Sequence, residues 1–329
     1  MKIRFFKKRR KIDLALSSGA ARGLAHVGVL RAVKEKGISI DMIAGSSMGA
    51  LIGACYAKEG EIGDFEEVVL KTDWKELVKL ADPNLSLLFK GVIHGVKVKE
   101  LLKAIIKDIE FKDLKIPLAV VATDVNTGEE VVIREGSVVE AVRASISIPG
   151  IFIPVKFKKR FLMDGGTVNP VPVSVAKDMG ATFVIASNAI HRPQKISPFS
   201  TVKKPKSPAA ISKMQVNNPA LAALNDKIDS LLQENKDIFE NLQKFIDLFK
   251  TKVYKEAQRI DSQTPNMFYT ILQAIYAMEY EIAKSKVKGA DIVIIPNVSH
   301  IAALEFYRGK EAILEGYKAA KEVFKKNNF

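Results

Sequence analysis

Along residues 12–190, short apolar runs alternate with segments whose apolar positions recur every three or four residues. The apolar runs predict strands at 12–16, 41–44, 118–122, 130–133, 152–157, 181–186 and, further along, 291–295. The amphipathic segments predict helices at 24–36, 48–58, 98–107, 137–144, 172–179 and 310–325. Strands separated by helices in this way are typical of a parallel sheet. We therefore expect an α/β fold with a mostly parallel central sheet and helices on both faces.

The alternation stops between His191 and Pro219, where five prolines with several lysines and serines have the composition of a linker. A long helix is predicted to follow at 220–259, with apolar residues spaced as in a coiled-coil seam but with a third apolar position in each seven. Such a stripe fits the protein's own core, a second copy or a lipid surface. The predicted regions are an arm at 1–11, a core at 12–190, an insertion at 191–262 and the rest of the core at 263–329.

Charge is concentrated at the start of the chain. The 329 residues carry 51 Lys and Arg against 37 Asp and Glu, a net charge of +14. Half of that excess lies in the arm at 1–11, which contains no acid and seven bases: Lys2, Arg4, Lys7, Lys8, Arg9, Arg10 and Lys11. The arm is either a solvated tail or a contact to anionic lipid, where each basic residue contributes about 1 kcal/mol. We expect no nucleic-acid binding, because no recognised motif accompanies the charge.

Composition narrows the class of protein further. Apolar residues make up 47% and charged residues 27% of the chain, which excludes a chain that is disordered throughout. The single Cys55 excludes an internal disulfide, and no Cys/His cluster offers metal ligands. The arm is not followed by the long apolar run and cleavage site that a signal peptide requires, and no stretch reaches membrane-spanning length. We expect a cytoplasmic protein that uses no cofactor or metal and that contacts the inner face of the membrane peripherally if the arm binds lipid.

The pentad 45–49 (GSSMG) is a GxSxG placed between a predicted strand and a predicted helix. A nucleophilic serine must project from a tight turn at this kind of junction, and Gly45 and Gly49 let the backbone turn without Cβ clashes. The N-terminus of the following helix also favours negative charge that develops nearby. This context predicts Ser47 as a nucleophile, although a glycine-rich strand-to-helix connection without chemistry has the same composition.

A second small-residue segment, 17–23 (SSGAARG), also joins a strand to a helix. It matches neither the dinucleotide-binding pattern nor the P-loop. Small residues there allow several backbone N–H groups to point into one concavity, which can hold an oxyanion or a phosphate. An anion-binding turn on one strand-to-helix connection and an exposed serine on the next are the two halves of an acyl-transfer site.

A serine nucleophile needs a base, and none of the four histidines has a local context that marks it as one: His26, His94, His191 and His300. Asp164, followed by Gly165 and Gly166, comes directly after the short apolar run 161–163 and is therefore a carboxylate at a strand end. A carboxylate within hydrogen-bond reach of Ser47 in a water-poor site can take the place of imidazole.

With these three segments in this order, the chain resembles the patatin-like phospholipases. That family's pattern is a glycine-rich oxyanion stretch with an Arg or Lys, then GxSxG, then Asp-Gly-Gly or Asp-Gly-Ala. The matches here are 19–23 with Arg22, 45–49, and 164–166. Neighbouring segments agree as well: 23–30 (GLAHVGVL), 144–149 (ASISIP), 169–172, 290–296 and 306–319. The likeness covers about 12–190 and 264–325.

The resemblance implies a serine lipid acyl hydrolase, acting as a phospholipase A, lysophospholipase or carboxylesterase through a Ser-Asp dyad. Ser47 would attack the ester, Asp164 would take its proton, and N–H groups near Gly19, Ala20 and Met48 would hold the oxyanion. Arg22 would belong to the same oxyanion hole, and the glycines of the three turns would support the motifs: Gly23, Gly45, Gly49, Gly165 and Gly166. Arg22 would either steady the turn, through a salt bridge, or meet a substrate phosphate.

Two departures from the family pattern keep a second hypothesis open. Where the family has a run of glycines, this chain has Ser17, Ser18 and Ala20 around Gly19, and a residue with a Cβ resists positive φ. The predicted helix at 220–259 has no counterpart in the pattern; it would be a lid or would mediate self-association. The alternative function is a non-catalytic lipid- or protein-binding module that retains the fold.

Overall fold

The computed structural model describes residues 11–62, 65–67, 69, 96–193, 267–303 and 305–327. Within these residues one sheet holds eight strands in the order β5-β6-β3-β2-β1-β7-β8, with β4 paired to β3. The strands are β1 (Ile12–Leu16), β2 (Met42–Ser46), β3 (Leu118–Asp124), β4 (Glu130–Ile133), β5 (Val155–Phe157), β6 (Arg160–Asp164), β7 (Phe183–Ser187) and β8 (Ile292–Ile294). The run β3-β2-β1-β7-β8 is parallel, whereas β4, β5 and β6 pair antiparallel.

The α-helices in the described ranges are α1 (Ala25–Glu35), α2 (Met48–Glu59), α5 (Val96–Ile106), α6 (Val138–Ser145), α7 (Val173–Asp178), α10 (Met267–Lys286) and α11 (Gly309–Lys326). Strand side chains alternate between two apolar layers: Leu14 and Leu16 join one, Ala15 the other. Helices α1, α2, α5, α6 and α11 contribute to the first layer, and α7 with α10 to the second. The α/β fold, with helices on both faces of the sheet, is confirmed.

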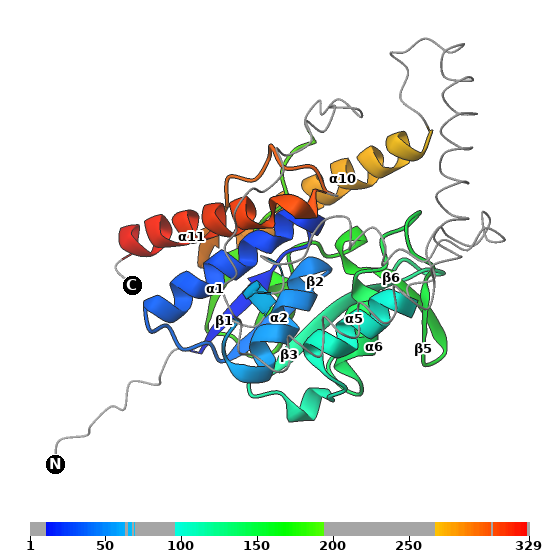
Figure 1. The fold of residues 1–329 in the computed structure, drawn as a ribbon, viewed down its shortest axis with the longest axis horizontal. Helices are drawn as coiled ribbons and strands as arrows, with labels where there is room; N and C mark the ends of the chain where they lie inside the picture. Colours follow the sequence, from blue (N-terminus) through cyan, green and yellow to red (C-terminus); the bar gives the residue numbers. More distant parts are fainter. Residues whose placement is uncertain are drawn as a thin grey trace, which may run out of the picture. The chain divides into compact units, whose positions relative to one another are not determined.

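Helix α11 lies directly along α1 (Figure 1). A Cβ on Gly28 of α1 would overlap the carbonyl oxygen of Ile313, and one on Gly316 of α11 would overlap that of Ala25. The two backbones therefore approach as closely as glycine permits. This pairing fixes the last helix of the chain, whose Phe324 is fully buried, against the helix that follows the small-residue turn.

The structure corrects the sequence-based elements at two places. The strand predicted at 152–157 begins only at Val155, because the preceding Pro154 has no N–H to give to the strand ladder. Helix α10 was not predicted at all. The arm apart from Lys11, the linker from 194 onward and the long helix predicted at 220–259 lie outside the described residues. Among the described helices, none has the length and apolar character needed to cross a membrane.

Candidate active site

Ser47 occupies the sharp turn between β2 and α2. Its backbone has φ +52° and ψ −120°, a conformation that side chains with a Cβ rarely adopt. A Cβ on Gly49 would overlap the carbonyl oxygen of Leu16, so only glycine lets the turn sit this close to β1. The Ser47 N–H donates to Ser145 Oγ at 2.8 Å, and Ser145 Oγ donates to Val121 O at 2.6 Å. These contacts hold the strained turn in place.

Asp164 ends β6, and its carboxylate lies against the serine. Ser47 Oγ donates to Asp164 Oδ2 at 2.5 Å, and Gly166 N–H donates to Asp164 Oδ1 at 2.7 Å. Both side chains are almost fully buried, at 4% and 2% exposure. A Cβ on Gly165 would overlap the carbonyl oxygen of Val121, so this glycine brings the Asp-Gly-Gly turn against β3. The two predicted residues thus meet through turns that only glycine permits.

The surroundings of Asp164 favour proton uptake. Burial raises the pKa of its carboxyl well above the usual aspartate range, and the hydrogen bonds from Ser47 and Gly166 offset this only in part. A buried carboxylate of raised pKa is a stronger base than an exposed one and can accept the proton of a serine hydroxyl.

The small-residue turn folds as η1 (Ala20–Leu24), a 3₁₀ helix beside the serine. Ala20 has φ +49°, so this alanine takes the left-handed conformation that glycine would adopt more readily, at a strain of about 1–2 kcal/mol. Although Ala20 stands where the family pattern has glycine, the backbone keeps the positive φ that glycine would allow. Gly23 lets η1 pack against the start of α2, because a Cβ on Gly23 would lie only 2.6 Å from the side chain of Met48.

The backbone donors around the serine fall into two groups. In the described structure, the N–H groups of Ser18, Ala21 and Arg22 donate to main-chain carbonyl oxygens at 2.9–3.1 Å. Across the same residues, the N–H groups of Gly19, Ala20 and Met48 donate to no acceptor. These are the three donors that the sequence predicts for an oxyanion, and unpaired donors at a helix start favour an anion.

Helix α10 adds two residues that the sequence analysis missed, Tyr276 and Glu279. Arg22 is almost fully buried, and its guanidinium carbon lies 5.6 Å from the centre of the Tyr276 ring. Within the described ranges Arg22 forms no ion pair, so the salt bridge that would organise the turn is replaced by stacking on the tyrosine. Tyr276 and Glu279 belong to none of the three motifs. Only a predicted helix at 267–286 could have indicated them.

Glu279 is a second buried carboxyl at the site. Ser18 Oγ donates to Glu279 Oε2 at 3.4 Å, and Glu279 Oε1 would lie 2.8 Å from a Cβ on Gly166. Burial raises the pKa of Glu279 and the charge of Asp164 raises it further, whereas Arg22 and the Ser18 hydroxyl lower it. The two carboxyls therefore compete for ionisation, and Glu279 is the one expected to hold a proton while Asp164 is ionised.

We expect Glu279→Gln to stabilise the fold in alkaline solution. A raised pKa favours folding below the ordinary glutamate pKa near 4, and this contribution is lost as the pH rises through the raised pKa. Glutamine removes that loss. At pH 8 the melting temperature should rise by at least about 2–4 °C, the equivalent of about 1 kcal/mol, and at pH 4 it should be unchanged. The control Glu281→Gln, exposed on the same helix, should show no such pH dependence; equal shifts in both variants would contradict the assignment.

The described histidines have other partners. The neutral ring of His26 donates from Nε2 to Ser17 O at 2.9 Å and accepts at Nδ1 from Ser187 Oγ at 2.8 Å, and burial lowers its pKa to about 4. His191 Nε2 donates to Pro296 O at 2.8 Å, and His300 Nε2 contacts Glu311. These three rings are bonded to strand ends, loops or Glu311, whereas the Ser47 hydroxyl donates to Asp164. His94 lies outside the described residues.

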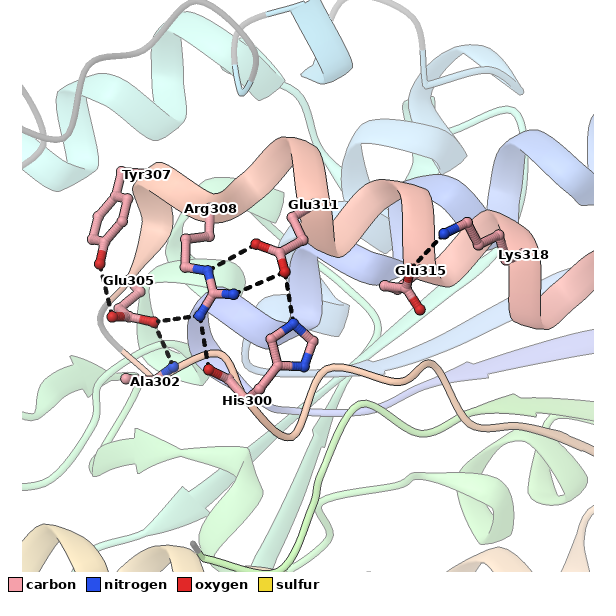
Figure 2. A network of polar contacts seen from close by, with 8 residues as sticks. All are labelled: His300, Ala302, Glu305, Tyr307, Arg308, Glu311, Glu315 and Lys318. Carbon is pink, nitrogen blue, oxygen red and sulfur yellow. Dashed lines mark hydrogen bonds and ion pairs between the residues drawn. The ribbon is translucent and has the colours of Figure 1, made fainter. Parts of the chain in front are cut away.

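A polar network at the start of α11 supports η1. Ala21 N–H donates to Ala303 O at 2.9 Å, which ties the turn to the segment before α11. Figure 2 shows how this segment is fixed: the Arg308 guanidinium bridges Glu305 and Glu311 at 2.8–3.2 Å. Through the bond from Ala21 to Ala303, this network helps to position η1. No group of three or more metal-ligating side chains occurs among the described residues.

The chain is similar to known proteins over the part that carries these motifs. The family model for patatin-like phospholipase matches residues 14–177. An uncharacterised NTE family protein of Mycobacterium tuberculosis is 36% identical over 176 residues, which are 54% of this chain and 48% of the relative. Human patatin-like phospholipase domain-containing protein 6 is 34% identical over 180 residues, 53% of this chain and 13% of that protein. The chain thus spans about half the length, or less, of these relatives.

A solved structure shows the same fold. VipD from Legionella pneumophila superposes with a TM-score of 0.53 at 13% identity, covering 96% of this chain and 67% of that one. At this identity the likeness concerns the fold alone. The family match includes the end of β1, η1, the GxSxG turn and the Asp-Gly-Gly turn, so it covers every segment that carries the three motifs. The chain therefore belongs to the patatin-like phospholipase family.

Proposed function

We propose that the chain is a serine lipid acyl hydrolase that cleaves fatty-acyl esters of phospholipid, lysophospholipid or simple carboxyl-ester type. The observation that carries the proposal is the 2.5 Å hydrogen bond from Ser47 Oγ to Asp164, in a buried site beside three unpaired N–H donors. Family membership supports lipid hydrolysis in general. The dyad and the oxyanion donors are inferred from the geometry.

In the proposed reaction, Asp164 takes the hydroxyl proton as Ser47 Oγ attacks the ester carbonyl carbon. The carbonyl oxygen becomes an oxyanion, which the N–H groups of Gly19, Ala20 and Met48 bind. The tetrahedral intermediate collapses, the alkoxide leaves with the proton held by Asp164, and the acyl group stays on the serine. Water then attacks the acyl-enzyme with Asp164 again as base, which releases the fatty acid and restores Ser47. Every step thus uses the side chains of Ser47 and Asp164, the backbone N–H donors and water.

Two measurements together test this function. We expect the purified full chain to hydrolyse short p-nitrophenyl esters and to be labelled by a fluorophosphonate, and Ser47→Ala to lose both properties. Ser46→Ala is the matched control, because Ser46 is the adjacent buried serine with no hydrogen-bond partner in the described structure. It should retain labelling. Saturable lipid binding without any Ser47-dependent turnover would instead favour the non-catalytic binding module.

Two partner proposals rest on sequence alone. Residues 1–11 would make peripheral contact with anionic membrane, and the predicted helix at 220–259 would cover the site entrance or join two copies of the chain. All of these residues except Lys11 lie outside the described part. Both are consistent with a lipid substrate, which an enzyme of this kind has to meet at or near a membrane surface.

A further inference from the structure

The hairpin formed by β5 and β6 combines exposed basic and aromatic side chains. Its strands pair Lys156 with Phe161 and Phe157 with Arg160 around a two-residue turn. Because neighbours on a strand point to opposite faces, Phe157 packs on the core while Lys156 and Phe161 share the outer face. Phe161 is 49% exposed, and the exposed Val125 lies beside it, its N–H bonded to Phe161 O at 2.8 Å. An apolar pair is thus flanked by lysine.

Most of the charge around this hairpin has no local partner. Lys158 pairs with Glu135, and Arg160 lies near Glu129 and Asp124. By contrast, three basic residues have no ion pair with any described residue: Arg134, Lys156 and Lys159. Arg134 and Lys159 also line a groove of about 390 Å³ between β4 and the hairpin, with an apolar floor that includes Ile133 and Leu162. Unpaired bases beside exposed apolar groups complement an anionic, amphipathic surface.

Strand β6 joins the hairpin directly to the active site, because its last residue is Asp164. Strands β1 and β2 end where η1 and Ser47 follow. Strand β6 runs antiparallel to β3, with Asp164 opposite Ala122 and Leu162 opposite Asp124, the last residue of β3. The start of β6 therefore lies beyond the end of β3, and β6 runs from there to Asp164. Arg160 is four residues from Asp164, about 13 Å at the usual rise of a strand.

Protection of a sheet edge does not account for these side chains. Lysines on an edge strand do prevent edge-to-edge pairing, but a half-exposed phenylalanine opposite Lys156 works against that purpose. The turn itself is strained, since Lys158 has φ +53° at a position that favours glycine in two-residue hairpins. Strained residues that persist outside the core often mark functional sites.

We propose that this hairpin surface, consisting of Lys156, Lys159, Phe161, Val125 and Arg134, docks the protein onto an anionic lipid bilayer. The bases would contact lipid phosphates while Phe161 and Val125 enter the interface, which would set the entrance to Ser47 toward the membrane. The proposal extends the proposed function, because it supplies the orientation that a lipid hydrolase needs. It assigns the contact to a folded hairpin, separately from the arm at 1–11.

Vesicle co-sedimentation tests the proposal on the full chain with Ser47→Ala, so that binding is measured without hydrolysis. The vesicles contain phosphatidylcholine either alone or mixed with phosphatidylglycerol, at low salt. We expect binding to the mixed vesicles only, reduced at least about 30-fold by Lys156→Glu with Lys159→Glu and about tenfold by Phe161→Ser. The charge-reversed pair keeps charged side chains on the edge, so it preserves edge protection. The arm is intact in every variant.

The matched control reverses Lys310 and Lys325, which are exposed on α11 beside β8, at the opposite end of the strand order from β5 (Figure 1). This control should change vesicle binding less than about threefold, although its net charge changes by the same amount. Equal losses in both reversed pairs, or wild-type binding by Lys156→Glu with Lys159→Glu, would overturn the proposal. Hydrolysis of a soluble ester, measured with Ser47 intact, should be unaffected by the hairpin variants; vesicle binding without any hydrolysis would refute the proposed function alone.

Discussion

Asp164→Asn is expected to lower kcat/KM for a soluble ester by about 10³-fold while the protein stays folded. A general base contributes about 10² to 10⁴ to such reactions, and asparagine keeps the shape of the side chain but cannot take the proton of Ser47. The turn around it should persist, because the Asp164 main chain is held independently by Ser147 and Thr123. The measurement is the steady-state rate on p-nitrophenyl esters beside a thermal unfolding curve.

Asp13→Asn is the matched control for this variant. Asp13 is likewise a buried aspartate on the same sheet, and burial raises its pKa to about 7. It lies near the start of β1, at the opposite end of that strand from η1 and the serine. The kcat/KM of Asp13→Asn should stay within about threefold of wild type, because Asp13 takes no part in proton transfer at Ser47. A comparable loss of kcat/KM in both variants would mean that a buried carboxyl affects the rate only by supporting the fold. That result would contradict the role of Asp164 as base.

The pH dependence follows from the same group. The base must be ionised to accept a proton, and burial raises the pKa of Asp164. The rate should therefore fall as the pH is lowered through this raised pKa, well above the range near 4 that an exposed aspartate would give. A kcat/KM profile that is flat down to pH 4 would show that Asp164 does not act as the base.

Gly316→Ala is expected to destabilise the protein by about 3 kcal/mol or more. The new Cβ would overlap the carbonyl oxygen of Ala25, and this neighbour is backbone, so relief requires α11 to move away from α1. Because α11 also contacts η1, the loss should extend to the oxyanion donors and lower the rate as well as the melting temperature. Thermal unfolding and ester hydrolysis on the same sample measure both effects.

Gly309→Ala in the same helix provides the control. There a Cβ would meet only side-chain methyl groups, of Val69 at 2.8 Å and Leu24 at 3.1 Å, which can shift. Alanine also favours the helix over glycine by up to about 1 kcal/mol. The expected change is therefore small in either direction. If Gly316→Ala were tolerated as well as Gly309→Ala, the close approach of α1 and α11 would not hold in solution.

Much of the sheet could be read from local pattern. The predicted bounds of β1 and β4 are those of the structure, because each is a short apolar run bounded by polar or turn residues. The turn bearing Ser47 also carries a strong local signal, since glycines at both ends of a strand-to-helix junction leave few alternative conformations. Strands and turns that depend on residues close together in the sequence can therefore be predicted from the local pattern of apolar residues and glycines.

The remaining features depend on contacts between distant segments. Glu279 reaches Ser18 across 261 positions, and no local pattern of α10 indicates that its carboxyl faces Asp164. The positive φ of Ala20 could not be predicted either, because alanine disfavours a positive φ and only the packing of η1 imposes it. Tertiary contacts therefore determine the electrostatics of the site, which the three motifs do not contain.

In the proposed mechanism, Ser47 itself carries the acyl group during turnover. Acid-quenched samples of the full chain hydrolysing a lysophospholipid, analysed by mass spectrometry, measure this directly. The proposed mechanism predicts a mass increase of one acyl chain on the peptide that contains Ser47, and none in Ser47→Ala, which should release no fatty acid. Undiminished release of fatty acid by Ser47→Ala, or an acyl group carried by a different residue of the active protein, would contradict it.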